Sequence, residues 1–475
     1  MTNATLELYH CFVTSKTMTE ETKDEKTDKK DQKERGSLSL TDLILFGLGN
    51  VVGAGIFIII SKSIFYGGNF SLYALLAVAA ISMIMGFCYI EIYGRYSSSI
   101  TEYLAVKNTM GEGVGQITLY AIYMFALLSG VTIVTAMAKY ACKCDLVETV
   151  KQNMSWTTDS LHSTLETAFS VALLCIMAFI NFMGIETSKV VANTISVVML
   201  VVILGIIVLS LPYIEWDKLA ASVSMGPSLR GGGSSSSTQS KGPWDNFVLS
   251  AILSLFLYNG YDFLVKISDE SADPENNKTA MISTIGITTL LYAGIMIAGI
   301  CVLGYKKAGA THNIITNLYE MLTTSKWASA VYMAGLFIMF NTGFLSIMSA
   351  TKFMEGLGKN SKIFIPEFWA KTNENDAPSN AIWISLAICI FFALFNNTTL
   401  MAIFSNFTCI SILILISIAL LILRWQEKDD LEAQLKHNYI WGNVSNMPVP
   451  VMANLGVLFY IMYEMFKNKF WIHVI

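Results

Sequence analysis

Long apolar runs separated by short polar segments recur along nearly the whole chain. Many of these runs approach the ~20 residues that a helix needs to cross the hydrocarbon core of a membrane. The pattern therefore predicts eleven spanning helices, at residues 41–65, 71–93, 114–139, 166–184, 188–211, 246–267, 280–304, 328–356, 379–396, 399–424 and 447–465.

The composition supports this interpretation. Apolar residues make up 54% of the 475 positions and charged residues only 14%, whereas a soluble domain carries about 25% charged residues. The chain is thus predicted to be an all-α polytopic membrane protein embedded in a lipid bilayer. A soluble protein and a nucleic-acid-binding protein are both disfavoured.

The polar segments define the ends and the middle of the chain. Residues 1–40 mix both charge signs and predict a disordered tail, and residues 212–245 include a Gly/Ser-rich stretch that predicts a flexible loop. More than half of the 31 Lys and Arg residues fall in the tail and the even-numbered loops, which favours a cytoplasmic N-terminus. A glycosylation sequon at Asn153 then lies on the outside. Residues 426–475 would form a peripheral eleventh helix and a short C-terminus.

The first predicted helix carries four glycines within nine residues: Gly47, Gly49, Gly53 and Gly55. Each glycine weakens a helix by about 1 kcal/mol relative to alanine. Small residues at Gly-x-x-x-Gly spacing, as at Gly49 and Gly53, also let membrane helices pack closely. Unwound backbone is tolerated in a bilayer only where it lines an enclosed cavity, so helix 1 is either broken for function or adapted for packing.

The sixth predicted helix favours the first alternative. It carries Asn259-Gly260 at its centre and Asp262 two residues later, and an acid at that depth is by default a functional-site hypothesis. Paired breaks five helices apart are typical of inverted-repeat transporters. We therefore predict one repeat at residues 41–211 and a second at residues 246–425.

The segment GNVVGAGIF at residues 49–57 resembles the first-helix motif of the amino acid–polyamine–organocation superfamily. Segments 86–106, 255–277, 346–381 and 421–425 are similar to that superfamily's helix 2, helix 6, helix 8 exit and helix 10 end. The pattern is nearest the L-type and cationic amino acid transporter branches. The resemblance implies a LeuT-like core of five plus five helices with helices 1 and 6 discontinuous, and secondary-active amino acid transport by alternating access.

The resemblance also implies a substrate site. Backbone amides near Gly53 would bind the substrate carboxylate, carbonyls of both breaks would bind its ammonium group, and Phe256 would be the gating aromatic. The implied binding residues are Val51, Val52, Gly53, Ala54, Gly55, Ile56, Phe256, Leu257, Tyr258, Asn259 and Gly260. The candidates for gating or specificity are Phe256, Asp262, Tyr123, Asn341, Phe404 and Asn406.

Two departures from the superfamily leave the coupling ion open. Many relatives carry a lysine in helix 5, and counting from Gly184 places Met199 there. The helix 8 exit usually holds an arginine, where this chain has Thr351-Lys352. Exchange and ion symport both remain candidate modes, with exchange or facilitated transport preferred.

Cys142 and Cys144 lie in a polar loop after helix 3. In heteromeric L-type relatives a cysteine of this loop bonds a single-span glycoprotein subunit, so either residue is a candidate for such a bond. The alternatives are free thiols or a bond between the two. Their C-x-C spacing lacks a second Cys or His pair, so a zinc site is not expected.

Other functions are weighed against transport. A membrane-embedded amino acid sensor would keep the fold and the site without net flux, and a polyamine is the alternative substrate. An enzyme is disfavoured because no histidine lies well inside a predicted span. No cofactor and no metal are expected, and the plasma membrane is the predicted location.

Overall fold

The computed structural model describes residues 37–68, 70–142, 159–221, 243–311, 313–323, 325–360, 366–428 and 448–467. Within these ranges nearly all regular structure is helical, and the β pairing is one isolated parallel bridge between Leu38 and Ser271. The predicted tail up to residue 36, most of the Gly/Ser-rich loop, the sequon and Cys144 lie outside the described residues.

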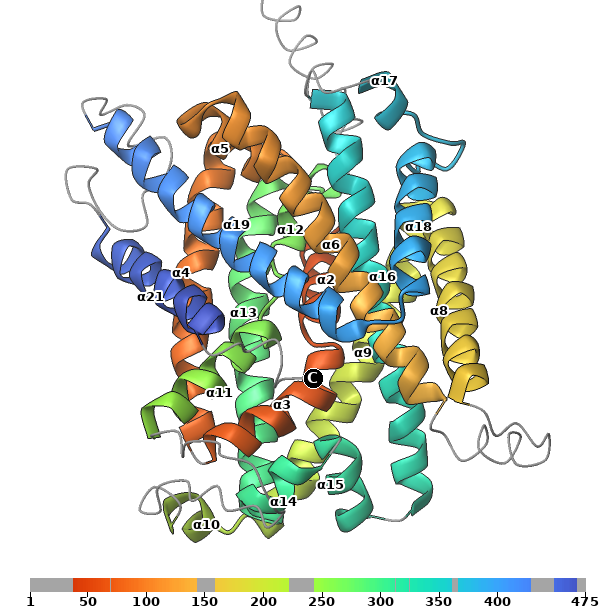
Figure 1. The fold of residues 1–475 in the computed structure, drawn as a ribbon, viewed down its shortest axis with the longest axis vertical. Coiled ribbons are helices and arrows are strands. Elements are labelled where there is room, and N and C mark those ends of the chain that lie inside the picture. The colour runs from red at the N-terminus through yellow and green to blue at the C-terminus, as the bar shows by residue number, and fades with distance from the viewer. Residues whose placement is uncertain are drawn as a thin grey trace, which may run out of the picture.

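Over its described residues, the first half of the chain forms nine elements (Figure 1). They are α2 (Leu40–Val51), α3 (Ala54–Gly67), α4 (Phe70–Tyr96), α5 (Thr101–Met110), α6 (Glu112–Ala141), α8 (Asp159–Phe182), α9 (Ile185–Ser210), the 3₁₀ turn η1 (Leu211–Tyr213) and α10 (Trp216–Ala221).

The second half begins with α11 (Pro243–Leu257), α12 (Phe263–Lys266) and the 3₁₀ turn η2 (Ser268–Glu270). It continues with α13 (Pro274–Ala298), a π-helical turn η3 (Gly299–Leu303), α14 (Tyr305–Ala310), α15 (Ile314–Leu322), α16 (Ser325–Asn360), α17 (Pro366–Trp369), α18 (Ser379–Leu394), α19 (Thr398–Gln426) and α21 (Val449–Lys467).

Among the described residues, seven helices are long and apolar enough to cross a membrane: α4, α6, α8, α9, α13, α16 and α19. Shorter apolar helices, α2, α11, α18 and α21, occupy the other predicted spans. The short helices α5, α14, α15 and α17 lie in or beside segments that the apolar pattern left as loops. They are too short or too polar to produce a spanning signal.

Both predicted helix breaks are present. The first span divides into α2, which ends at Val51, and α3, which begins at Ala54. The second divides into α11, which ends at Leu257, and α12, which begins at Phe263. Gly260 lies between them with a φ of 116°, a conformation that other residues rarely adopt.

The halves of the broken helices pack against each other and against neighbouring helices. α3 packs against α11, α2 packs against α13 and α9, and α6 packs against both α16 and α19. Figure 1 shows α2 and α12 in the upper half of the view and α3 and α11 in the lower half. Residues of both breaks line one cavity together with Phe125 and Ala126, so the breaks lie near each other beside α6.

A buried charge network joins the ends of α4 and α19. The Arg424 guanidinium donates to Glu91 Oε1 and Oε2 at 2.7 and 2.5 Å. Arg95 also contacts Glu91, and it pairs with Glu427 at 2.9 Å. The side chains of Glu91, Arg95 and Arg424 are at most 3% exposed. Such a network holds two helices together only while every charge keeps its partner.

We expect Glu91→Gln to destabilise the protein by about 3–5 kcal/mol, because it removes the buried carboxylate that both Arg424 and Arg95 contact. The matched control is Glu112→Gln, which breaks the exposed pair with Lys107 and should cost less than about 1 kcal/mol. Thermal unfolding of both variants in detergent measures the difference. Equal midpoints would show that the Glu91–Arg424 pair does not hold α4 to α19.

Candidate functional site

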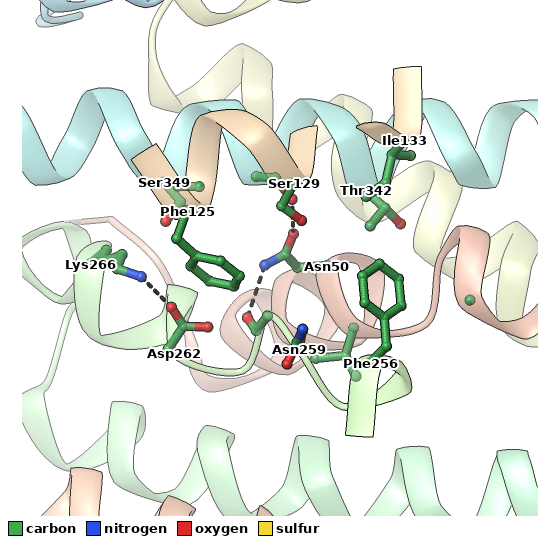
Figure 2. A pocket seen from close by; sticks show the side chains of 15 residues that line it. Asn50, Phe125, Ser129, Ile133, Phe256, Asn259, Asp262, Lys266, Thr342 and Ser349 are labelled. Carbon is green, nitrogen blue, oxygen red and sulfur yellow. Dashed lines mark hydrogen bonds and ion pairs between the residues drawn. The ribbon is translucent and has the colours of Figure 1, made fainter. Parts of the chain in front are cut away.

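A cavity of about 40 Å³ lies between the two helix breaks, which is room for only a few water molecules. Figure 2 shows the side chains around it, with Phe125 and Ser129 on α6 and Thr342 and Ser349 on α16. The residues lining it are Asn50, Val51, Gly55, Phe125, Ala126, Ser129, Ile133, Phe256, Asn259, Gly260, Asp262, Lys266, Thr342, Ser346 and Ser349.

One side of the cavity is the N-terminal end of α3. Gly53 is the N-cap residue and no side chain caps the helix there. The N–H groups at the start of a helix have no partner within it, so Ala54 and Gly55 present backbone donors at this end. The helix dipole adds a partial positive charge. This end of α3 is suited to an anionic group.

The carbonyls left by the breaks have buried partners. The Tyr292 hydroxyl, on α13, lies 2.9 Å from the Val51 carbonyl oxygen and 3.0 Å from that of Leu257. One tyrosine thus bridges the ends of α2 and α11. Thr342 Oγ1 donates to the Gly49 carbonyl at 2.8 Å, so α16 also supports the end of α2.

Asn50 connects the first break to the second. Its Nδ2 donates to the Gly260 carbonyl at 2.9 Å, and its Oδ1 accepts from Ser346 Oγ at 3.2 Å (Figure 2). A Cβ at Gly260 would lie 2.8 Å from Asn50 Nδ2. Glycine is therefore required there both for the backbone conformation and for the approach of Asn50.

Ionisable side chains lie at one end of the cavity. Lys266 forms an ion pair with Asp262, and both residues line the cavity (Figure 2). Glu102, on α5, has its Oε2 3.7 Å from Lys266 Nζ, and its Oε1 accepts from the Tyr89 hydroxyl at 2.8 Å. Burial raises the pKa of Glu102, and the nearby Lys266 ammonium opposes that shift.

The predicted binding residues divide into two groups. Val51, Gly55, Phe256, Asn259 and Gly260 line the cavity, as does Asp262, a predicted gating or specificity residue. Val52, Gly53, Ala54, Ile56, Leu257 and Tyr258 lie in or beside the breaks without lining it. Their role in binding stays a prediction.

Four of the predicted gating or specificity residues do not line the central cavity. Tyr123 points to α18, where its hydroxyl lies 2.9 Å from Ser385 Oγ, and Asn341 Nδ2 donates to Ser196 Oγ at 3.2 Å. Phe404 is 53% exposed. Asn406 lines an adjoining cavity together with Phe256 and Asn259. Of these four, none lines the central cavity.

On α6 and α16, the nearest side chains that do line the cavity lie one or two positions from Tyr123 and Asn341. Phe125 follows Tyr123 by two residues, which turns its side chain about 200° around α6, and Thr342 follows Asn341 by one. The spacing of Thr342, Ser346 and Ser349 places three small polar side chains on one face of α16. The spacing of these polar residues in the sequence could have predicted this wall of the cavity.

The structure also places the two positions, Met199 and Lys352, where the sequence departs from the superfamily pattern. Met199 is buried on α9. Lys352 forms an ion pair with Glu270 and a second pair at 3.0 Å with Glu355, so a basic side chain at the exit of α16 does contact the segment after α12. Leu38 packs against the segment after α12. Its N–H donates to the Glu270 carbonyl and its carbonyl accepts from the Ala272 N–H, both at 3.0 Å.

The remaining chemical candidates are limited. Cys142 is buried at the end of α6, which disfavours it for a bond to another chain, and Cys144 lies outside the described residues. Over the part of the chain that the structure describes, no group of three His, Cys, Asp or Glu side chains is arranged to hold a metal ion.

Comparison with known proteins decides the family. The family model "Amino acid permease" matches residues 38–470, which includes both breaks and all the cavity walls. The chain belongs to the amino acid permease family. It is accordingly a multi-pass membrane transporter with the all-helical fold predicted from the sequence, and not an enzyme.

Individual relatives are distant transporters. The chain is 20% identical over 435 residues to the methylthioribose transporter of Bacillus subtilis (strain 168), covering 90% of this chain and 88% of that one. It is 22% identical over 375 residues to the aspartate-proton symporter of the same organism, covering 75% and 67%. An uncharacterized transporter of Mycobacterium tuberculosis (strain ATCC 25618 / H37Rv) is 22% identical over 271 residues, covering 57% and 54%.

We expect Gly53→Ala to abolish uptake, because the added Cβ would overlap Oγ1 and Cβ of Thr342 and push α16 away from the break. Gly286→Ala on α13 is the control, since nothing lies within 4 Å of its added Cβ. Uptake into proteoliposomes and thermal unfolding measure both effects. Wild-type uptake in Gly53→Ala would contradict the close contact between the break and α16.

Tyr292→Phe should destabilise the protein by about 1–3 kcal/mol, because two buried carbonyls lose their shared donor. Tyr258→Phe is matched, since it removes a buried tyrosine hydroxyl that bonds only a side chain, Thr289 Oγ1, at 3.0 Å. We expect Tyr292→Phe to be the more destabilised of the two in thermal unfolding, and to lose more uptake. The reverse order would mean that the hydroxyl of Tyr292 is dispensable at the breaks.

Proposed function

We propose that this permease is a secondary-active transporter of amino acids or a related amine, working by alternating access as an exchanger or facilitator. One observation carries the proposal. The uncapped backbone donors of α3 and the carboxyl ends of α2 and α11, where Val51 and Phe256 lie, border one cavity between the two breaks, and the carboxyl end of a helix carries a partial negative charge. A free amino acid carries a carboxylate and an ammonium group a few bonds apart, so it complements both sets of backbone groups.

Recognition through the backbone leaves the choice of side chain to the cavity walls. The walls are small or apolar on α6 and α16, at Ser129, Ile133 and Ser346, and carry the paired charges Asp262 and Lys266 at one end. The cavity has room for only a few water molecules in this structure. We therefore expect the walls to move on binding, with Phe256 as the aromatic that closes over the substrate.

The test is counterflow in proteoliposomes. Vesicles are loaded with one unlabelled compound at a time, and uptake of labelled leucine, arginine, aspartate, putrescine or methylthioribose is followed. Putrescine tests the polyamine alternative, and methylthioribose is the substrate named for one relative. Uptake that depends on the internal compound, at least tenfold above empty vesicles, is the expected result for at least one amino acid.

Gly55→Leu serves as the blocked variant, because even its Cβ would lie 2.9 Å from the Leu257 side chain at the second break. Gly286→Leu, with open space around its Cβ, is the matched control. We expect the first to lose counterflow and the second to retain it. If correctly folded wild-type protein moves none of the five compounds, transport is contradicted and the sensor interpretation takes its place.

A further inference from the structure

Three ionisable side chains form a buried cluster beside the substrate cavity: Glu102, Asp262 and Lys266. The side chains of Glu102 and Lys266 are 1% exposed and that of Asp262 is 14% exposed. Ionised side chains at such depth are costly and mark ion pathways or proton relays when they occur in membrane proteins. The backbone-binding scheme described above needs none of the three.

The charges in the cluster do not balance. Lys266 contributes one positive charge and the two carboxylates contribute two negative charges, so the fully ionised cluster carries one excess negative charge. Lys266 is bonded to Asp262, whereas Glu102 Oε2 has no hydrogen bond and lies 3.7 Å from Lys266 Nζ. The excess charge therefore belongs to Glu102. A buried unbalanced carboxylate is strongly disfavoured unless it takes up a proton.

The groups facing Glu102 come from several elements. Tyr89, on α4, donates its hydroxyl to Glu102 Oε1. Asp262, Lys266 and Tyr261 come from the second break and α12, and Cys409 comes from α19. Of these, Lys266 is the one basic group among the described residues that face Glu102.

The position of the cluster connects it to the site. Asp262 and Lys266 line the cavity and belong to the short segment between the second break and η2. Glu102 lies on α5, a separate element that packs on α6 and α19. Any movement of α12 during transport changes the distance from Lys266 to Glu102, and with it the charge balance around Glu102.

We propose that Glu102 is a proton-binding site that couples substrate movement to a proton. Its carboxylate takes one proton from solution on Oε2 when α12 holds Lys266 on Asp262, as in this structure. The same proton returns to solution when α12 moves and Lys266 comes closer to Glu102. The inference rests on the proposed function: it keeps the site and alternating access, and it assigns proton symport rather than exchange or facilitated transport as the mode of coupling.

The experiment uses full-length protein in sodium-free proteoliposomes that contain a trapped pH-sensitive dye, with the membrane potential held at zero by valinomycin and potassium. Leucine, arginine and aspartate are added in turn outside. The wild type should acidify the interior as it takes up substrate. Glu102→Gln keeps the shape of the side chain without the titrating group, and should lose at least tenfold in acidification per substrate taken up.

Glu112→Gln, which removes an exposed carboxylate at the start of α6, is the matched control and should behave as the wild type. Uptake by the wild type without acidification would overturn the proposal. So would unchanged acidification in Glu102→Gln, or uptake that requires sodium and ignores pH.

Tyr89→Phe provides a second variant that keeps the packing. The Tyr89 hydroxyl stabilises the ionised carboxylate, so it lowers the pKa of Glu102. Its removal should therefore move the pH midpoint of proton uptake to more alkaline values, by about one unit. An unchanged or more acidic midpoint would contradict the assignment to Glu102.

Failure of this proposal can be distinguished from failure of the proposed function. Purified wild type and Glu102→Gln are titrated in detergent between pH 5 and pH 9, without any substrate. One proton fewer in the variant supports the site even if no compound is transported. Superimposable curves overturn it even if transport is found, because an ordinary glutamate is already ionised above pH 5.

Discussion

A backbone that leaves its helix inside a bilayer must find partners for its N–H and C=O groups, and this constraint organises the centre of the protein. Both breaks are supported from outside themselves. Tyr292 reaches two carbonyls, Asn50 reaches across from one break to the other, and Thr342 supports the end of α2. What these supports leave uncovered is the start of α3, and that is where a substrate carboxylate has donors available.

The glycines of the first helix serve the break and the packing together. From the sequence alone, a helix break and close helix packing are alternative explanations for these glycines. Glycine both weakens a helix and lets a neighbouring helix approach closely. Gly53 lies at the break and also faces Thr342 so closely that no side chain fits between them. Close approach of α16 is what supplies a donor to the Gly49 carbonyl. Packing is thus the means by which the break is stabilised.

The sequence predicts the fold and the positions of the breaks well, because both depend on local properties: apolar length, glycine content and an acid at mid-membrane. The cavity walls are less accessible. Whether Tyr123 or Phe125 faces the cavity depends on how α6 is rotated against its neighbours, and apolar side chains surround most of that helix.

Glu102 escaped attention for a different reason. It lies in a polar segment between two predicted spans, which the apolar pattern assigns to solvent, yet the chain folds it under α4 and against Lys266. Tyr292 likewise has no local signal, since a tyrosine in an apolar helix is an ordinary packing residue until its carbonyl partners are known.

The segment after α12 connects several parts of the protein. Residues 268–272 are tied to Leu38 ahead of α2 by two backbone hydrogen bonds, to α16 through Lys352, and to the turn after α4 through Ser99, which bonds Asp269 at 2.5 Å. The two half-helices α2 and α12 are therefore both connected to the segment 268–272. A movement of either half-helix that opens this end of the protein must therefore carry residues 268–272 along or break their bonds to Leu38, Lys352 and Ser99.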